Sequence, residues 1–317
     1  MGSSKKSESA FLSNTRLELN FGSNMNVAIL GSGQIGTDLL IKLSKLAEFK
    51  VVLVAGRRAD SAGLKVATDM NIPTSTAGID GVLALTELDV LIDCTSAADH
   101  INHWKLLKDL NLHVLDMTPA KIGDVYIPNV LPIKEKNEQA YLNLNLVTCG
   151  GQSSSPLVFA ISKILAIRRV EIASNIASLS AGPATRANID EYIDTTEKVL
   201  ATVSGASETK AILVLNPAVP PITMQTTIYI DYEPTKDFAS QAITDEINTT
   251  IRDMQSYVPG VRLLMRPVIT PERITITLQV KGNGDYLPSY SGNLDIINAA
   301  AIHALYDLWR RDAGVNS

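Results

Sequence analysis

The stretch NVAILGSGQIG, residues 26–36, decides the fold. Its first five residues predict a buried strand, and Gly31, Gly33 and Gly36 follow that strand directly. In a strand–loop–helix unit the first glycine makes a tight turn, the second lets the backbone approach a pyrophosphate, and the third lets helix and strand pack closely. We therefore predict a dinucleotide-binding loop, with an ordinary glycine turn as the alternative. The loop residues expected at the cofactor are Gly31, Ser32, Gly33, Gln34, Ile35 and Gly36.

The chain around this stretch alternates short aliphatic runs with helical patterns, which is typical of a parallel sheet with crossover helices. We predict an α/β, Rossmann-type doubly wound sheet. Its further strands are expected at residues 51–56, 90–95, 113–118 and 144–149, and its helices near 35–47, 78–86 and 97–109.

After Cys149 the spacing becomes longer and less regular, which predicts a second, α+β domain with a mainly antiparallel sheet. Its strands are expected at residues 170–178, 211–217, 226–234 and 274–282, and its helices near 186–204 and 237–257. A last helix is predicted from Asn293, placed as the N-cap, with Asp295 in the first turn.

The predicted division has three parts. Residues 25–149 with 291–317 form the dinucleotide-binding domain, residues 150–290 form a catalytic and dimerisation domain, and the polar residues 1–24 form a disordered leader or an expression remnant.

The 317 residues have an ordinary globular composition, with 45% hydrophobic and 19% charged residues and a net charge of -5. This balance argues against nucleic acid partners, and no apolar run is long enough to predict a membrane span. Two cysteines and no secretory signal pattern predict a cytoplasmic protein with free thiols.

The tip of the second predicted strand distinguishes the two nicotinamide cofactors. An NAD enzyme usually has an acid there for the ribose 2′-hydroxyl, whereas this chain has Gly56, Arg57 and Arg58. Two guanidiniums suit a 2′-phosphate, so we predict NADP(H) in preference to NAD(H). The alternative is a solvated turn.

The stretch LNLVTCGGQSSSPLVFAISKIL, residues 144–165, places Cys149 between a strand and a helix expected to begin near Ser154 or Pro156. A helix N-terminus lowers a thiol pKa and can hold an oxyanion, and Gly150 and Gly151 leave room for a substrate carbon. We therefore predict that Cys149 is a nucleophile. The alternative, a buried structural cysteine, is our interpretation of Cys94.

A nucleotide domain followed by such a cysteine predicts a definite chemistry. The thiolate adds to an aldehyde, hydride passes to the nicotinamide, and an acceptor cleaves the resulting thioester. Phosphate, water and another thiol remain open as acceptors. We predict no metal site.

From Asn26 to about Ala304 the chain resembles the acylating acetaldehyde dehydrogenases. The matching runs are GSGQIGTDLLIK, DCTSA, VTCGGQ, SAGPATRANIDEY, LNPAVPP, YVPG and YLPSYSGNLDI. The resemblance implies a Rossmann domain, a mixed α+β domain that dimerises, thioester exchange with coenzyme A, and an aldolase partner.

The resemblance also implies site residues. The nucleophile falls on Cys149 and a nicotinamide-contacting asparagine on Asn293. Thr95 and Ser96, in DCTSA, are expected at the cofactor. Arg186 and Asn188 are expected to orient the reacting groups, although Arg186 could instead pair with Asp190 at i,i+4.

Three departures from the family pattern change these expectations. Arg57 replaces the usual acid and reinforces NADP(H). Thr226 replaces the acid thought to assist the cysteine. The segment Val261 to Arg273 is shorter than usual, which weakens the expectation of an aldolase partner and suggests a larger acyl-CoA or an acyl group on a carrier protein's phosphopantetheine arm.

The leading hypothesis is an NADP(H)-dependent acylating aldehyde dehydrogenase, equally an acyl-thioester reductase, that forms a homodimer. One alternative is an acyl-phosphate reductase of the semialdehyde dehydrogenase type, which needs a histidine near the cysteine. Another is a non-catalytic NADP-binding protein.

Overall fold

The computed structural model describes residues 24–133, 141–234 and 240–313. Residues 1–23, which make up nearly all of the predicted leader, lie outside this part of the chain. Residues 235–239 also lie outside it, and they include the first residues of the helix expected at 237–257.

The first sheet has seven strands in the order β3-β2-β1-β4-β5-β7-β6, and every pair is parallel. The strands are β1 Met25–Leu30, β2 Phe49–Ala55, β3 Thr74–Ser75, β4 Val90–Asp93, β5 His113–Asp116, β6 Asp124–Val125 and β7 Asn143–Asn145. The order reverses between β1 and β4, and ligands of such sheets bind at this switch point. The predicted doubly wound α/β fold is confirmed.

Four helices accompany this sheet: α1 Gln34–Leu43, α2 Ala62–Asp69, α3 Ile79–Leu83 and α4 Ala97–Leu107. The sequence analysis predicted three of them within a few residues and missed α2. It also missed β3 and β6, because two residues are too short to show a period.

The second sheet runs β11-β13-β10-β8-β9, with β12 paired to β13. Its strands are β8 Ile167–Ala177, β9 Glu208–Asn216, β10 Met224–Tyr232, β11 Val261–Leu263, β12 Val268–Ile269 and β13 Arg273–Val280. All pairs are antiparallel except β8 with β9. That one pair is parallel because a helical crossover joins the two strands.

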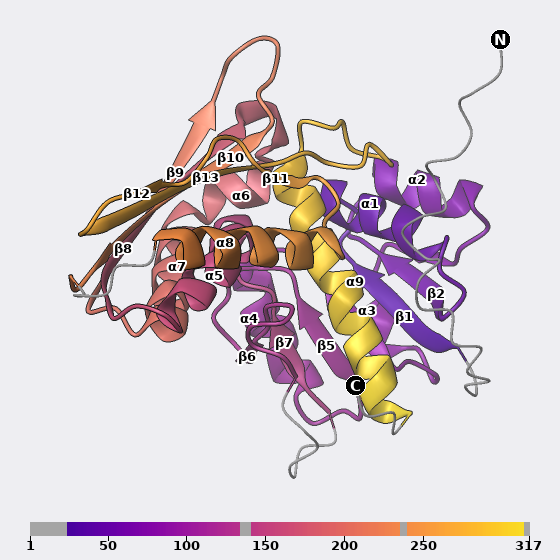
Figure 1. Ribbon diagram of the computed structural model, residues 1–317. Coiled ribbons are helices and arrows are strands. Elements are labelled where there is room, and N and C mark those ends of the chain that lie inside the picture. The colour runs from indigo at the N-terminus through magenta and orange to yellow at the C-terminus, as the bar shows by residue number, and fades with distance from the viewer. Residues whose placement is uncertain (1–23, 134–140, 235–239, 314–317) are drawn as a thin grey trace, which may run out of the picture.

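Helices cover one face of the second sheet (Figure 1). They are α5 Cys149–Ser162, α7 Ile189–Ser204 and α8 Ser240–Gln255, and the short η1 Ser178–Ser180 and α6 Pro183–Ala187 precede α7. Strand residues alternate accordingly: Ile172 and Ile228 are fully buried beneath the helices, whereas Ala173 and Thr227 on the opposite face are partly exposed.

The last helix, α9 Gly292–Asp312, runs between the two sheets and packs on α1 and α5 (Figure 1). The prediction that Asn293 caps it is wrong. The helix begins at Gly292 after Ser291, and Asn293 lies in its first turn with Asp295.

A buried lysine joins α9 to α1. Lys42 Nζ lies 2.5 Å from Asp38, 2.9 Å from Asp295 and 3.0 Å from Asp285. Asn298 of α9 also donates to Asp38 at 2.8 Å. The first and last helices are therefore connected through a charged network.

Candidate active site

The glycine loop has the geometry that the sequence predicts. Gly31 has a φ of +116°, and a Cβ there would lie 2.7 Å from the carbonyl oxygen of Cys94. At Gly33 a Cβ would meet no described atom within 4 Å, so its backbone faces open space. At Gly36 a Cβ would lie 2.0 Å from the Gly31 carbonyl oxygen, so this glycine lets α1 pack against the loop.

A groove of about 1230 Å³ opens above this loop. It is bounded by the glycine loop, the tip of β2, the turn from β4 into α4, and α6. Of the predicted cofactor residues, Gly36 and Asn293 do not line this groove, and Gly36 lies beneath the loop. The predicted residues that line it are Gly31, Ser32, Gly33, Gln34, Ile35, Arg57, Arg58, Thr95 and Ser96. The groove has the size and position of a dinucleotide site at the carboxyl ends of the strands.

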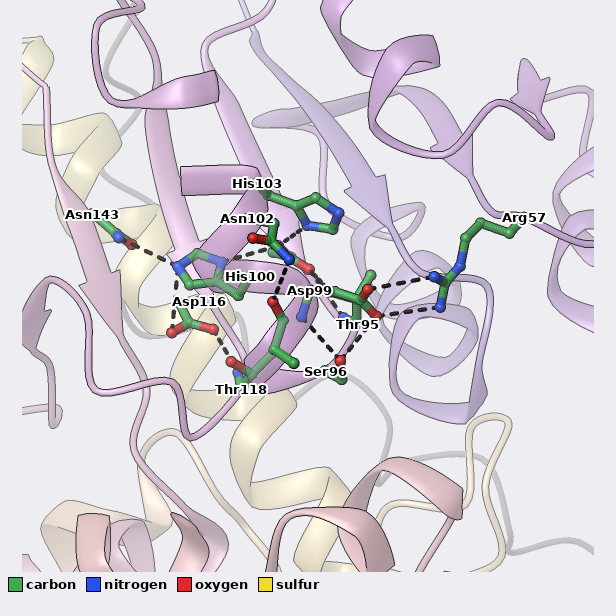
Figure 2. Close-up of polar contacts among 12 residues, drawn as sticks. Arg57, Thr95, Ser96, Asp99, His100, Asn102, His103, Asp116, Thr118 and Asn143 are labelled. Atoms are coloured by element: carbon green, nitrogen blue, oxygen red, sulfur yellow. Dashed lines mark hydrogen bonds and ion pairs between the residues drawn. The ribbon is translucent and has the colours of Figure 1, made fainter. Parts of the chain in front are cut away.

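Arg57 faces an acid that the sequence analysis did not anticipate. Its guanidinium donates to the two carboxylate oxygens of Asp99 at 3.2 and 3.4 Å, and the Ser96 hydroxyl donates to the same carboxylate at 2.9 Å (Figure 2). Asp99 lies in the first turn of α4, 42 residues from Arg57. Asp99 therefore offsets part of the positive charge of Arg57 at the edge of the groove. Arg58 is exposed and lies 3.6 Å from Asp60.

A small cavity of about 90 Å³ contains Cys149. It shares the lining residues Ile35, Thr95, Ser96, Thr185 and Leu294 with the groove, so the two spaces lie next to each other. The structure therefore brings the predicted nucleophile to the end of the predicted cofactor groove.

Asn293 lines the same cavity. Its amide nitrogen lies 3.5 Å from the Ser180 carbonyl oxygen, and its buried Oδ1 has no hydrogen-bond partner among the described residues. An unpaired buried acceptor is costly unless a ligand fills it. A carboxamide N–H group, such as that of nicotinamide, would satisfy this oxygen.

Helix α5 begins at Cys149 itself, so the prediction of a start near Ser154 or Pro156 is wrong. The Thr148 hydroxyl accepts the Gly151 N–H at 2.9 Å, and this cap fixes the start of the helix. Pro156 consequently lies inside the helix, where it removes one backbone hydrogen bond.

The turn before Cys149 is held in a conformation unusual for its residue. Val147 has a φ of 62°, which is strained for a β-branched side chain. Asn145 braces it: its Oδ1 accepts the Val147 N–H at 2.9 Å, and its Nδ2 donates to Asp116 at 2.7 Å.

The predicted lowering of the Cys149 pKa is also wrong for this state. Burial raises the pKa of the thiol to about 11, and this outweighs the lowering by a hydrogen bond to Tyr192 and by the backbone N–H groups of Gly150 and Cys149. Cys94 is only partly buried and borders the groove, and burial raises its thiol pKa as well.

A chain of buried hydroxyls lies beside Cys149. The thiol lies 3.8 Å from Tyr192 Oη, and Ser174 Oγ lies close by, since both oxygens would contact a Cβ at Gly150, at 2.2 and 3.0 Å. Thr226 Oγ1 lies 3.1 Å from Ser174 Oγ and 3.1 Å from Ser153 Oγ. The sequence analysis did not single out Tyr192, Ser174 or Ser153. Tyr192 follows the cavity residue Asn188 by one helical turn, and that spacing could have indicated it.

Arg186 does not line the cavity. It donates to the Ser178 carbonyl at 2.8 Å, to the Ser178 hydroxyl at 2.8 Å and to the Ala181 carbonyl at 3.0 Å. These hydrogen bonds fix the segment before α6. Arg186 makes them in place of the alternative ion pair with Asp190.

His100 and His103 both contact the buried carboxylate of Asp93, at the carboxyl end of β4 (Figure 2). Asp93 lies 2.9 Å from His100 Nδ1 and 2.8 Å from His103 Nδ1, and these bonds, with one from Thr95, lower its pKa to about 2 although burial opposes the shift. Burial raises the pKa of nearby Asp116 to about 6. The pKa of His100 is raised, because Asp93 and Asp116 outweigh its burial.

The described residues include neither a metal-ligand cluster nor a membrane-spanning helix. No three or more His, Cys, Asp or Glu side chains gather there in a way that could hold a metal ion. No helix in the same part of the chain has the length and apolarity needed to cross a membrane.

A Rossmann-type sheet whose groove ends at a buried cysteine on a second, mixed-sheet unit defines a two-domain aldehyde or acyl-thioester oxidoreductase. Comparisons with known proteins agree. The family described as "Prokaryotic acetaldehyde dehydrogenase, dimerisation" matches residues 149–288. Relatives named acetaldehyde dehydrogenase include those of Pectobacterium atrosepticum (49% identical over 89% of this chain and 95% of the relative), Spirochaeta aurantia (48%, over 88% and 92%) and Geobacillus stearothermophilus (45%, over 90% and 96%). The chain belongs to the acylating acetaldehyde dehydrogenase family.

Proposed function

We propose that this protein is an NADP(H)-dependent acylating aldehyde dehydrogenase that works through a covalent acyl-cysteine on Cys149. The observation that carries the proposal is that the groove and the cavity that holds this thiol share five lining residues and therefore adjoin. A hydride acceptor in the groove and a carbon bonded to the sulfur can then lie side by side.

In the reductive direction, the Cys149 thiolate attacks the carbonyl carbon of an acyl thioester. The backbone N–H groups of Cys149 and Gly150, which lie at the sulfur, stabilise the oxyanion, and the departing thiolate takes up the proton that Cys149 gave up. The bound nicotinamide supplies a hydride. When the resulting thiohemiacetal collapses, Cys149 leaves as thiolate and the aldehyde is released.

One observation supports a preference for NADP(H). Arg57 and Arg58 both border the groove at the tip of β2, where a cofactor of this fold places its adenosine ribose. Asp99 neutralises Arg57 in this state, and a 2′-phosphate would compete with it for the guanidinium. Asn293 would hold the nicotinamide carboxamide at the other end.

The thioester is proposed to be that of coenzyme A or of a carrier protein's phosphopantetheine arm, because both present the same reacting thiol. We propose a cytoplasmic homodimer in which residues 25–149 with 291–317 form the dinucleotide-binding domain and residues 150–290 form the catalytic and dimerisation domain. The sheet face opposite α5, α7 and α8 supports dimerisation: Asn175 on it has a buried Oδ1 without a partner among the described residues. An aldolase or a carrier protein remains the proposed macromolecular partner.

Reduction of an acyl phosphate is disfavoured. The residues lining the cavity around Cys149 are all uncharged and, within the described part of the chain, include no histidine. A doubly charged phosphate leaving group would have no cation to neutralise it there.

The test follows NADPH consumption with a series of short acyl-CoA thioesters, with NADH in parallel and Cys149→Ala as the control. The proposal predicts consumption that prefers NADPH and is abolished in Cys149→Ala, while this variant still binds NADPH. Consumption that survives in Cys149→Ala would refute the mechanism. Binding of NADPH without consumption would refute the acyl-CoA substrate, and an acylated carrier protein would then be assayed.

A further inference from the structure

Cys149 lies in a neutral environment. Of the residues that line its cavity, only Cys149 and Tyr192 are titratable, and none of them is a carboxylate, an imidazole or an ammonium group. A thiolate formed there depends on hydrogen-bond donors for its stability, because no counter-charge borders the cavity.

The Tyr192 hydroxyl is in hydrogen-bond contact with the sulfur, and in the thiol form the S–H group donates to its oxygen. Its oxygen lies 3.8 Å from Cys149 Sγ, and it is packed so closely on Gly150 that a Cβ at that glycine would lie 2.2 Å from it. Gly150 therefore admits the tyrosine hydroxyl to the first turn of α5.

Two further buried hydroxyl groups lie near the Tyr192 hydroxyl. Ser174 on β8 is close to Tyr192, because a Cβ at Gly150 would lie 2.2 Å from the Tyr192 oxygen and 3.0 Å from Ser174 Oγ, and Ser174 Oγ lies 3.1 Å from Thr226 Oγ1 on β10. Ser174 and Thr226 are both fully buried, so water does not compete for their hydrogen bonds. Thr226 is neutral, whereas a second negative charge at this position would disfavour the thiolate.

We propose that Tyr192 is a catalytic residue that donates a hydrogen bond to the Cys149 thiolate, and that Ser174 and Thr226 are positioning residues for its hydroxyl. Burial, together with the charge of Cys149, raises the pKa of Tyr192 well above its ordinary value, so the phenol keeps its proton and acts as a donor rather than as a base. The inference rests on Cys149 being the nucleophile of the proposed function.

The test measures the rate of Cys149 alkylation by iodoacetamide as a function of pH, with mass spectrometry to separate Cys149 from Cys94. A hydrogen bond to a charged group is worth about tenfold or more in an equilibrium. Tyr192→Phe should therefore raise the pH midpoint of alkylation by about one unit and slow the reaction at neutral pH about tenfold. The pH midpoint of NADPH oxidation should move in the same direction.

Tyr257→Phe is the matched control, because Tyr257 is also buried and its hydroxyl has no hydrogen-bond partner among the described residues. Its alkylation profile should equal that of the wild type. Ser174→Ala should shift the alkylation profile in the same direction as Tyr192→Phe, but by less. If Tyr192→Phe no longer binds NADPH, the Ser174→Ala profile tests the proposal in its place.

An alkylation profile of Tyr192→Phe that matches the wild type would overturn the proposal. This outcome differs from failure of the proposed function, because alkylation reports on the thiol whether or not turnover occurs. If Cys149 were not the nucleophile, the Cys149→Ala variant would still turn over.

Discussion

Asp99 lies opposite Arg57 at the edge of the cofactor groove, and its carboxylate offsets part of the positive charge at the tip of β2. Sequence near the tip shows only two arginines, and the pattern correctly indicates a cationic edge. The acid comes from α4, 42 residues away, and no local pattern reports a partner at that distance. The residue types at the site were therefore predictable, but this pairing was not.

Asp99→Asn should tighten NADP⁺ binding about two- to fivefold, because an exposed ion pair is worth roughly 0.2–1 kcal/mol and the amide no longer competes for Arg57. Arg57→Asp should have the opposite effect and favour NAD⁺. Titration calorimetry with both cofactors measures this. Asp69→Asn, at an exposed position of α2 that does not line the groove, is the control. Unchanged or weaker NADP⁺ binding in Asp99→Asn would contradict the competition.

At the scale of elements, the long periodic segments were predictable and their ends were not. Both sheets, α7 and α9 follow from hydrophobic period. The start of α5 does not, because Thr148 forms the cap and the small residues after it show no helical period. Asn293 was misplaced for a similar reason: it has the type of a cap, yet α9 starts one residue earlier, and its amide faces the cavity instead.

The ends of β4 and β5 carry a pH-dependent contribution to stability. The folded pKa of His100 lies above its unfolded value of 6.5, so its contribution is complete below about pH 6.5 and is lost as the pH rises through the folded pKa. His100→Gln should lower the free energy of unfolding by roughly 1–3 kcal/mol at pH 6, and by less at pH 8.

Urea denaturation of wild type and His100→Gln at both pH values measures this difference. His303→Gln is the control, because His303 lies on α9, is partly exposed and pairs with Asp307 away from this cluster. An equal loss for His100→Gln at pH 6 and pH 8 would show that charge on His100 does not stabilise the fold.

For the whole molecule, Lys42 holds the first helix of the nucleotide domain against the last helix of the chain. Three carboxylates, from α1, from the segment before α9 and from α9, converge on its ammonium group. Burial opposes the shift, but the charges and hydrogen bonds of Asp295 and Asp38 outweigh it and raise the pKa of Lys42. Asn293 of the cavity precedes Asp295 by two residues, so this network anchors the end of α9 that lines the cavity.

Lys42→Met should lower the free energy of unfolding by about 3–5 kcal/mol, since it leaves buried carboxylates without their counter-charge. Urea denaturation measures the loss. Lys45→Met is the matched control: Lys45 contacts Asp285 too, but its side chain is 59% exposed, so it should cost about 1 kcal/mol or less. Similar losses for the two variants would contradict a buried network at Lys42.

The most direct test of the central claim is to trap the acyl-enzyme. The protein is mixed with acetyl-CoA without NADPH, quenched in acid and digested, and the peptides are weighed. The account predicts one acetyl group on the peptide that contains Cys149, none on the Cys94 peptide, and loss of the label when NADPH is added before the quench. Reduction of acetyl-CoA by an enzyme that never carries acetyl on Cys149 would contradict it.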